Sequence, residues 1–170
     1  MKINVLRRGL VVLVAGVVGA VVLAGTSAGA PEAESGQRKP DVVAQWAAAW
    51  NGDEPQALAK LFTRDATYTD LGVNKVSTGR DGVAAWKAAT DQLIADAHVT
   101  VTNSFRSGDR VAAESIYSGH IKGAPSAFAV PMSTVFELRG NLIRSDRDYY
   151  SVSLLLSQSG LPADWTPPTG

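Results

Sequence analysis

Four long runs with the alternation of β-strands dominate the second half of the sequence. They span residues 98–106, 110–121, 128–139 and 142–152. β-Branched and aromatic residues are frequent in them, as expected of strands that bury one face. Gly108 and Gly140 lie in short polar segments that fit tight turns between neighbouring strands. The sequence therefore predicts an antiparallel meander whose apolar face needs a covering layer.

Helical patterns before the meander supply that layer. The first helix begins after Pro40, with Asp41 as its N-cap, and its apolar residues recur at three- and four-residue spacing. Pro55 suits the first turn of a second, short helix. A third helix starts near Gly79 and continues to about Ile94, with apolar residues at helical spacing. These segments predict three amphipathic helices.

A short strand-like run, 66–70, interrupts the helical region and is closed by a turn at Leu71-Gly72. The fold class predicted from the whole pattern is α+β, with three N-terminal helices packed on a strongly curved, mostly antiparallel sheet. After the last strand, 152–158 fits a short closing helix. The proline-rich tail, 161–170, is expected to be loose.

The first thirty residues differ from the rest and predict a secretory signal peptide over 1–30. Arg7-Arg8 precedes an apolar run over 9–25, which ends in small residues. Cleavage after Ala28 or after Ala30 fits this pattern, and an uncleaved membrane anchor is the alternative. The arginine pair also resembles a twin-arginine export signal. We therefore expect a secreted or cell-envelope protein without a stable membrane span if the signal is cleaved.

The remaining chain divides into a flexible linker over 31–39, one domain over 40–160 and the tail. There is no cysteine, which excludes disulfides and a lipid-modified cysteine. After the predicted export segment the chain has thirteen basic and sixteen acidic residues, so its net charge is slightly negative. A nucleic-acid partner is therefore not expected. Two histidines give no metal-ligand set, and 79–82 lacks the pattern of a phosphate-binding loop. We expect no metal and no cofactor.

Five groups of short strings follow one another over residues 40–160. They are Trp46 to Asp70, with Asn51-Gly52-Asp53; Gly79-Arg80-Asp81-Gly82-Val83; Gly108-Asp109-Arg110-Val111-Ala112; Val135-Phe136-Glu137-Leu138 with Gly140-Asn141-Leu142-Ile143; and Asp148-Tyr149-Tyr150 with Gln158-Ser159-Gly160. In this order they resemble the SnoaL-like and nuclear-transport-factor-like superfamily. The resemblance implies a cone-shaped barrel, the cystatin-like roll, with a deep pocket. Relatives include steroid isomerases, polyketide cyclases, epoxide hydrolases and non-catalytic binding modules, so the fold alone does not give the function.

Asp70 stands at the end of the first strand, where the resemblance to steroid isomerases implies a catalytic base. A partly desolvated carboxylate gains basicity and can move a proton beside a carbonyl. The oxyanion-stabilising tyrosine and acid of those enzymes correspond here to Trp46 and to Ser133 or Thr134, which are poorer donors. The alternative interpretation makes Asp70 a turn cap.

Asp148 lies where the resemblance to SnoaL-like cyclases and related epoxide hydrolases implies a catalytic aspartate. Many relatives carry a further aspartate where this chain has Ser151, and if that position does the chemistry, the site is lost here. Strand alternation puts Asp146, Asp148 and Tyr150 on one face. The alternative is a solvated carboxylate paired with a neighbouring arginine.

His120 is the third catalytic candidate. It ends the strand 110–121 and shares a face with Glu114 and Ser118. An imidazole facing a pocket can act as acid or base near neutral pH, whereas a strand-end histidine is often merely exposed. The predicted substrate-binding residues are Trp46, Tyr68, Trp86, Glu114 and Tyr150.

Two classes of function fit these observations. The first is acid/base isomerase, cyclase or hydrolase chemistry on a small, largely apolar molecule. The second is a non-catalytic module of the cell envelope that binds such a molecule or serves in dimerisation through the open sheet face. A weaker third reading is an accessory domain for envelope assembly. The sequence identifies neither the ligand nor the oligomeric state.

Overall fold

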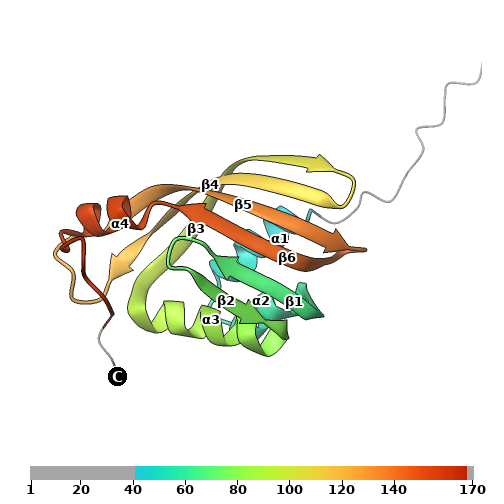
Figure 1. Ribbon diagram of the computed structural model, residues 1–170, viewed down its shortest axis with the longest axis horizontal. Helices are drawn as coiled ribbons and strands as arrows, with labels where there is room; N and C mark the ends of the chain where they lie inside the picture. The colour runs from blue at the N-terminus through green and yellow to red at the C-terminus, as the bar shows by residue number, and fades with distance from the viewer. Residues whose placement is uncertain (1–40, 168–170) are drawn as a thin grey trace, which may run out of the picture. The chain divides into compact units, whose positions relative to one another are not determined.

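The computed structural model describes residues 41–167. The predicted signal peptide and linker, and the last three residues of the tail, lie outside the described residues. Figure 1 shows the order of elements along the chain. They are α1 (Val42–Trp50), α2 (Pro55–Lys60), β1 (Phe62–Asp70), β2 (Lys75–Thr78), α3 (Gly79–Leu93), β3 (Ile94–Ser107), β4 (Arg110–Ile121), β5 (Phe128–Arg139), β6 (Leu142–Tyr150) and α4 (Val152–Ser159).

The six strands form one mixed sheet in the order β2-β1-β6-β5-β4-β3. The predicted meander is present, because β3, β4, β5 and β6 pair with antiparallel neighbours in sequence order. The sheet is curled but not closed, as expected for the cone-shaped α+β fold. Two features were not predicted: the short strand β2 and the parallel pairing of β1 with β6. This parallel pair brings the first and last long strands together.

The helices form where the sequence predicted them. Asp41 caps α1 by accepting hydrogen bonds from the backbone N–H groups of Val43 and Ala44 at 3.0 and 3.2 Å. The apolar stripe of α1 is buried, and Trp46 packs edge-on against Phe136 of β5 with ring centroids 5.3 Å apart. Helix α1 contacts β3, and α3 contacts both β1 and β3. The helices therefore cover the concave face of the sheet (Figure 1).

The strand β3 is longer than predicted and is bent near its start. It begins at Ile94, and its register with β4 shifts between Ala95 and His98, where Asp96 adopts φ 53°. Opposite this irregularity, a Cβ on Gly119 would lie 2.5 Å from Ile94 Cγ2, so only glycine allows the close approach. The bulge and this contact curve the sheet around the core.

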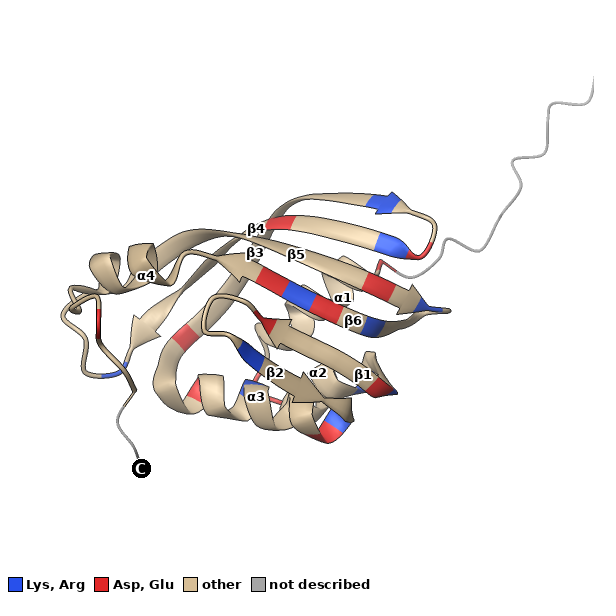
Figure 2. Cartoon of the chain, viewed as in Figure 1, with Lys and Arg blue, Asp and Glu red and all other residues tan. Residues whose placement is uncertain are grey.

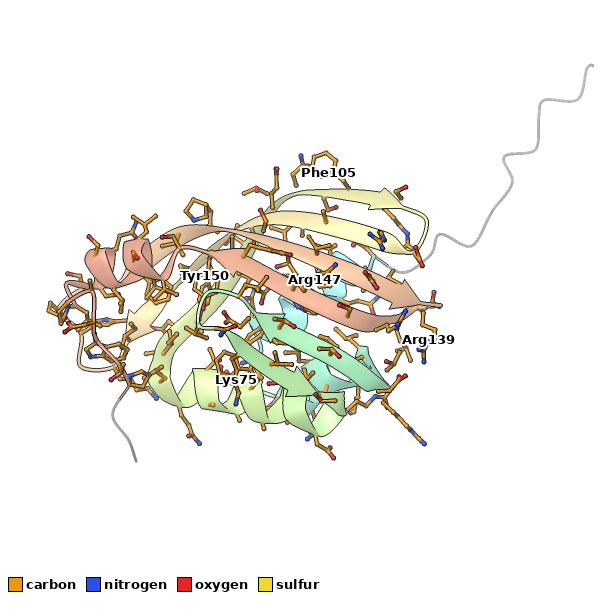
Figure 3. The ribbon with its side chains drawn as sticks, viewed as in Figure 1. Lys75, Phe105, Arg139, Arg147 and Tyr150 are labelled. Atoms are coloured by element: carbon orange, nitrogen blue, oxygen red, sulfur yellow. The ribbon has the colours of Figure 1, made fainter. Side chains whose placement is uncertain are left out.

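Charged side chains of both signs are spread over the sheet, and acidic and basic residues alternate along β6 (Figure 2). Phe105 and Arg147 lie on outward-facing parts of the strands, whereas Tyr150 turns toward the interior (Figure 3). No helix within residues 41–167 is long and apolar enough to cross a bilayer.

Candidate functional site

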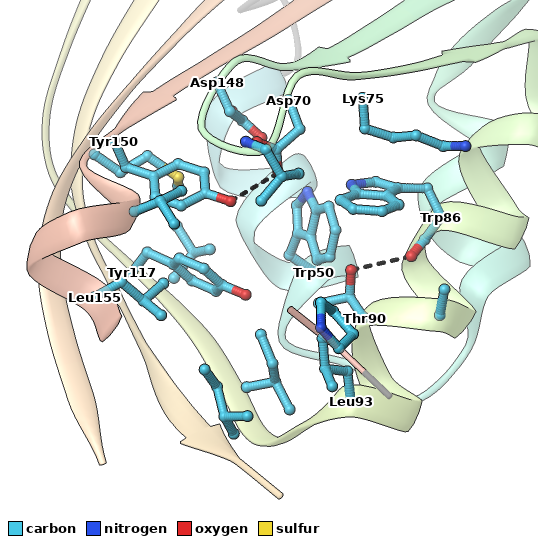
Figure 4. A pocket seen from close by; sticks show the side chains of 18 of the residues that line it. Trp50, Asp70, Lys75, Trp86, Thr90, Leu93, Tyr117, Asp148, Tyr150 and Leu155 are labelled. Carbon is cyan, nitrogen blue, oxygen red and sulfur yellow. Dashed lines mark hydrogen bonds between the residues drawn. The ribbon is translucent and has the colours of Figure 1, made fainter. Parts of the chain in front are cut away.

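A cavity of about 770 Å³ lies between α3, α4 and the concave face of the sheet. This volume is within the range of small-molecule pockets. Figure 4 shows the cavity with its aromatic and carboxylate side chains. Its wall contains four of the five predicted substrate-binding residues: Trp46, Tyr68, Trp86 and Tyr150.

Asp70 and Asp148 lie side by side on the pocket wall. They are register partners in the parallel pair of β1 and β6, and the backbone N–H of Leu71 donates to the carbonyl of Asp148 at 3.0 Å. Both are almost completely buried, with exposures of 5 % and 4 %, yet both line the cavity. The two predicted catalytic carboxyls are therefore brought together.

Two hydroxyl groups orient the carboxyl of Asp148. Tyr68 donates to Oδ2, and Thr134 donates to Oδ1 at 2.5 Å. Burial raises the pKa of Asp148 to about 7, and the charge of nearby Asp70 acts in the same direction, whereas the hydrogen bonds from Thr134 and Tyr68 lower it. A carboxyl with this pKa exchanges its proton near neutral pH.

Asp70 both caps the turn after β1 and lines the pocket. Its Oδ1 accepts from the backbone N–H of Val73 at 3.1 Å, which caps the turn after β1. Its Oδ2 accepts from the hydroxyl of Tyr150 at 3.0 Å inside the pocket (Figure 4). Burial raises the pKa of Asp70, and these hydrogen bonds oppose the increase.

A third carboxyl, Asp146, lies behind this pair and was not among the predicted site residues. It is fully buried, and neither carboxylate oxygen accepts a hydrogen bond from a residue within 41–167. Burial and the neighbouring charge of Asp148 raise the pKa of Asp146 well above its ordinary value, because both disfavour the ionised form. Strand alternation correctly predicted that Asp146 shares a face of β6 with Asp148.

Aromatic rings enclose much of the cavity. Trp50, Tyr117 and Trp165 line it in addition to the predicted aromatic residues. The rings of Tyr117 and Tyr150 meet edge to face with centroids 5.7 Å apart. The hydroxyl of Tyr117 makes no hydrogen bond to another described residue and projects into the hollow (Figure 4). Tyr117, which was not among the predicted site residues, is thus a further donor in the pocket wall.

His120 and Glu114 do not line the pocket, which corrects their predicted placement. They do share a face of β4, but the side chains that alternate with them, including Tyr117 and Ile121, face the cavity. Glu114 is exposed, and Nε2 of the half-buried His120 lies 2.8 Å from the carbonyl oxygen of Ala124. Strand alternation correctly predicted that His120 and Glu114 share a face of β4, but the pocket lies against the opposite face.

No basic side chain within residues 41–167 forms an ion pair with Asp70 or Asp148. Lys75 lines the pocket mouth, but it is exposed and its side chain extends away from both carboxyls (Figure 4). The part of the chain that the structure describes contains no group of three or more histidine, aspartate or glutamate side chains placed to hold a metal ion. The site is therefore an acidic, largely aromatic pocket.

Comparisons with known proteins agree with this architecture. The family described as the SnoaL-like domain matches residues 43–145. A hypothetical protein from Catenulispora acidiphila with a ketosteroid isomerase-like fold, solved in complex with trimethylamine, is 54 % identical over 76 % of this chain and 99 % of its own, with a TM-score of 0.75. No curated protein matches the chain.

Two more distant structures share the fold alone. A polyketide cyclase candidate from Xanthomonas campestris is 20 % identical over 72 % of this chain and 97 % of its own, with a TM-score of 0.64. A phenazine biosynthesis-related protein from Pseudomonas aeruginosa is 18 % identical over 79 % of this chain and 92 % of its own, with a TM-score of 0.63.

Proposed function

Because this chain belongs to the SnoaL-like family, we propose that it is an exported protein whose pocket performs acid/base chemistry on a small, largely apolar molecule. Asp148 is the proton-transferring group and Asp70 is the second carboxyl. The observation that supports this proposal best is the state of Asp148: it is buried, lines the cavity and has a pKa of about 7. A base titrating there is half ionised at neutral pH and can both accept and return a proton.

The surroundings of Asp148 suit such a transfer. Tyr68 and Thr134 fix the orientation of its carboxyl through two hydrogen bonds. The free hydroxyl of Tyr117 projects into the same cavity and can donate to a substrate oxygen that gains charge when a neighbouring C–H proton is removed. In this proposal Tyr117 donates the hydrogen bond that stabilises the oxyanion. Trp46 and Ser133 or Thr134, at the positions of the donors in steroid isomerases, are poorer donors.

The test is carbon-bound hydrogen exchange. The protein is incubated in D₂O with a panel of cyclic and aryl ketones, and deuterium incorporation beside the carbonyl is measured by mass spectrometry. Asp148→Asn is expected to slow incorporation about 100-fold or more. Asp65→Asn, which removes an exposed carboxylate from the same sheet, is the matched control and is expected to act like the wild type. Equal rates in the wild type and in the Asp70→Asn/Asp148→Asn double variant contradict the proposal.

A second candidate is a non-catalytic binding module for a small organic amine. The trimethylamine complex of the 54 % identical relative favours it. Aromatic faces and carboxylates are also the groups that attract an ammonium ion. Titration with trimethylammonium, followed by NMR of the tryptophan indole N–H groups, tests this candidate. Saturable binding without any ketone exchange supports it, and absence of binding at millimolar concentration contradicts it.

Export and assembly are further parts of the proposal. The charged start, the apolar run over 9–25 and the small residues that follow it support export. Mass measurement of the mature protein from the culture medium or envelope is expected to give an N-terminus near residue 29 or 31. A chain that retains residue 1 contradicts cleavage and favours the tethered reading.

Sedimentation analysis decides between a monomer and the homodimer expected through the open sheet face.

A further inference from the structure

The pocket has two chemically different ends. Asp70 and Asp148 occupy one end, with the hydroxyl groups of Tyr117 and Tyr150 near them, and Leu93 lies at the other end (Figure 4). Aliphatic side chains from α4, Val152, Leu155 and Leu156, also line the cavity. A ligand that fills this cavity therefore meets an acidic end and an apolar end.

The tail after α4 builds part of the apolar wall of the pocket. Gly160 ends the helix with φ 73°, and the backbone N–H of Leu161 then donates to the carbonyl of Leu156 at 2.9 Å, which turns the chain back. A further turn follows, in which the N–H of Trp165 donates to the carbonyl of Pro162 at 3.1 Å. Trp165 is half-buried against the core and lines the cavity. Two residues of the segment expected to be loose, Trp165 and Pro167, thus line the pocket.

The acidic end suits a cation. Asp70 and Asp148 have no basic partner within residues 41–167, and their negative charge is stabilised only by hydroxyl and backbone donors. The rings of Trp50 and Tyr117 line the same cavity. A cation placed between carboxylates and aromatic faces gains from both the ionic attraction and the ring quadrupoles, and it relieves the cost of burying the two acids.

The cavity has room for a ligand larger than a simple methylated ammonium ion. A volume of about 770 Å³ is in the range that encloses drug-sized molecules. A bare methylated ammonium ion would fill only the acidic end and would leave the apolar wall, including Trp165, in contact with water. The apolar end needs a second part of the ligand to cover it.

We infer that the ligand of this pocket is an amphipathic amine, with its cationic nitrogen at Asp70 and Asp148 and its apolar body against the Trp165 wall. This inference rests on the second candidate function, the binding of an organic amine in this cavity, and extends it to the apolar part of the ligand. Trp165 is a specificity-determining residue: it favours amines that carry an apolar chain or ring over small amines.

A chain-length series tests the inference. The probes are tetramethylammonium and butyl-, hexyl- and octyltrimethylammonium, with affinities measured by calorimetry. For the wild type the affinity is expected to increase about fourfold for each methylene that becomes buried. Trp165→Ala is expected to lose most of this increase for the octyl probe, while its affinity for tetramethylammonium stays within about twofold. Phe105→Ala removes an exposed ring outside the pocket and is the control.

Three outcomes decide the inference. Tetramethylammonium binding without any effect of chain length overturns it but leaves the pocket as a ligand site. No binding of any probe, with ketone exchange intact, overturns the amine class but not the acid/base proposal. A neutral analogue with a tert-butyl group in place of trimethylammonium must bind at least tenfold more weakly, and equal affinity overturns the cationic assignment. Trp165→Phe and circular dichroism of both variants exclude misfolding as the cause of a loss.

Discussion

Asp70 and Asp148 lie opposite each other in the parallel pair of β1 and β6, and both carboxyls enter one pocket. Asp70 is held by the turn after β1 and by Tyr150, whereas Asp148 is held by Tyr68 and Thr134. Each carboxyl therefore has its own set of donors. This arrangement allows the two groups to have different proton affinities at a short separation along the sheet.

The stability of the protein is expected to fall as the pH rises from about 4 to 7. Asp148 has a pKa of about 7 in the folded state against 3.8 as the ordinary value, so the folded protein binds more protons in this interval. Linkage then gives a negative slope of up to about 1.4 kcal/mol per pH unit for one group. Asp70 and Asp146, whose pKa values are also raised, act in the same direction.

Urea unfolding at pH 4.5, 6 and 7.5 checks this slope. Asp148→Asn removes one titrating group without changing the shape of the side chain, so its free energy of unfolding is expected to fall less steeply. Asp65→Asn is the control, because hydrogen bonds from Thr63, its own backbone and Arg139 lower the pKa of that exposed acid, so its removal is expected to leave the downward slope in place. A wild-type stability that increases through this interval would refute the assignment of raised pKa values.

Cation affinity is expected to change with pH in the opposite sense. Tetramethylammonium has no titrating proton, so any pH dependence must come from the protein. Ionisation of Asp148 near its pKa of about 7 supplies the charge, and affinity is therefore expected to rise about tenfold between pH 5.5 and 8. Calorimetry at both pH values measures this change. In Asp148→Asn the rise should be largely absent, and an unchanged rise would assign the effect to another group.

Removing the donors to Asp148 is expected to raise its pKa further. Tyr68→Phe and Thr134→Val each delete one hydroxyl that stabilises the ionised carboxylate. A hydrogen bond to a charged group contributes about 1.5–3 kcal/mol, which corresponds to a rise of about one pKa unit or more. NMR titration of ¹³C-labelled aspartate carboxyls reports the value directly. A pKa of Asp148 that stays constant in both variants would mean that these bonds do not set its proton affinity.

Gly72→Ala is expected to destabilise the fold and disturb the pocket. A Cβ at this position would lie 2.5 Å from Cζ of Tyr150. The ring of Tyr150 is held between Asp70 and Tyr117, so it cannot move away without losing those contacts. The cost is expected to be about 1–3 kcal/mol, measured by urea unfolding.

Two further variants isolate this contact. Gly52→Ala meets only two backbone oxygens, at 3.4 and 3.8 Å, and is the matched control, with a small expected effect. In the Tyr150→Ala background the added methyl has room, so Gly72→Ala should cost much less there. The same cost in both backgrounds would show that the clash with Tyr150 is not its origin.

The sequence predicted the local elements well because their signals are local. The strands over 110–121 and 128–139 have the predicted bounds, since alternation is complete along each. β2 has only four residues, too few for a periodic pattern, and the parallel pairing of β1 with β6 depends on contacts between distant segments. The sequence of neither strand contains a local signal for such long-range pairing.

The sequence identified the two carboxyls of the candidate site, but it did not show which face of β4 lines the pocket. Strand alternation groups His120 with Glu114 but does not say which side of β4 the helices cover. Tyr117 alternates with them and looks like any core residue, although its hydroxyl reaches the pocket. Trp165 lies three residues after Pro162 in a segment without periodicity, so its place in the pocket wall depends on the turns after Gly160.

The parallel pairing of β1 with β6 also affects when the acidic centre can form. One carboxyl comes from the first strand of the domain and the other from the last, so a growing or translocating chain carries no complete centre until β6 has emerged. Pairing β1 with β6 closes a long loop and has a high entropic cost, which slows it. We therefore expect the acidic centre to assemble late in folding. A chain halted before β6 would lack Asp148, so the proposed proton transfer requires the complete domain.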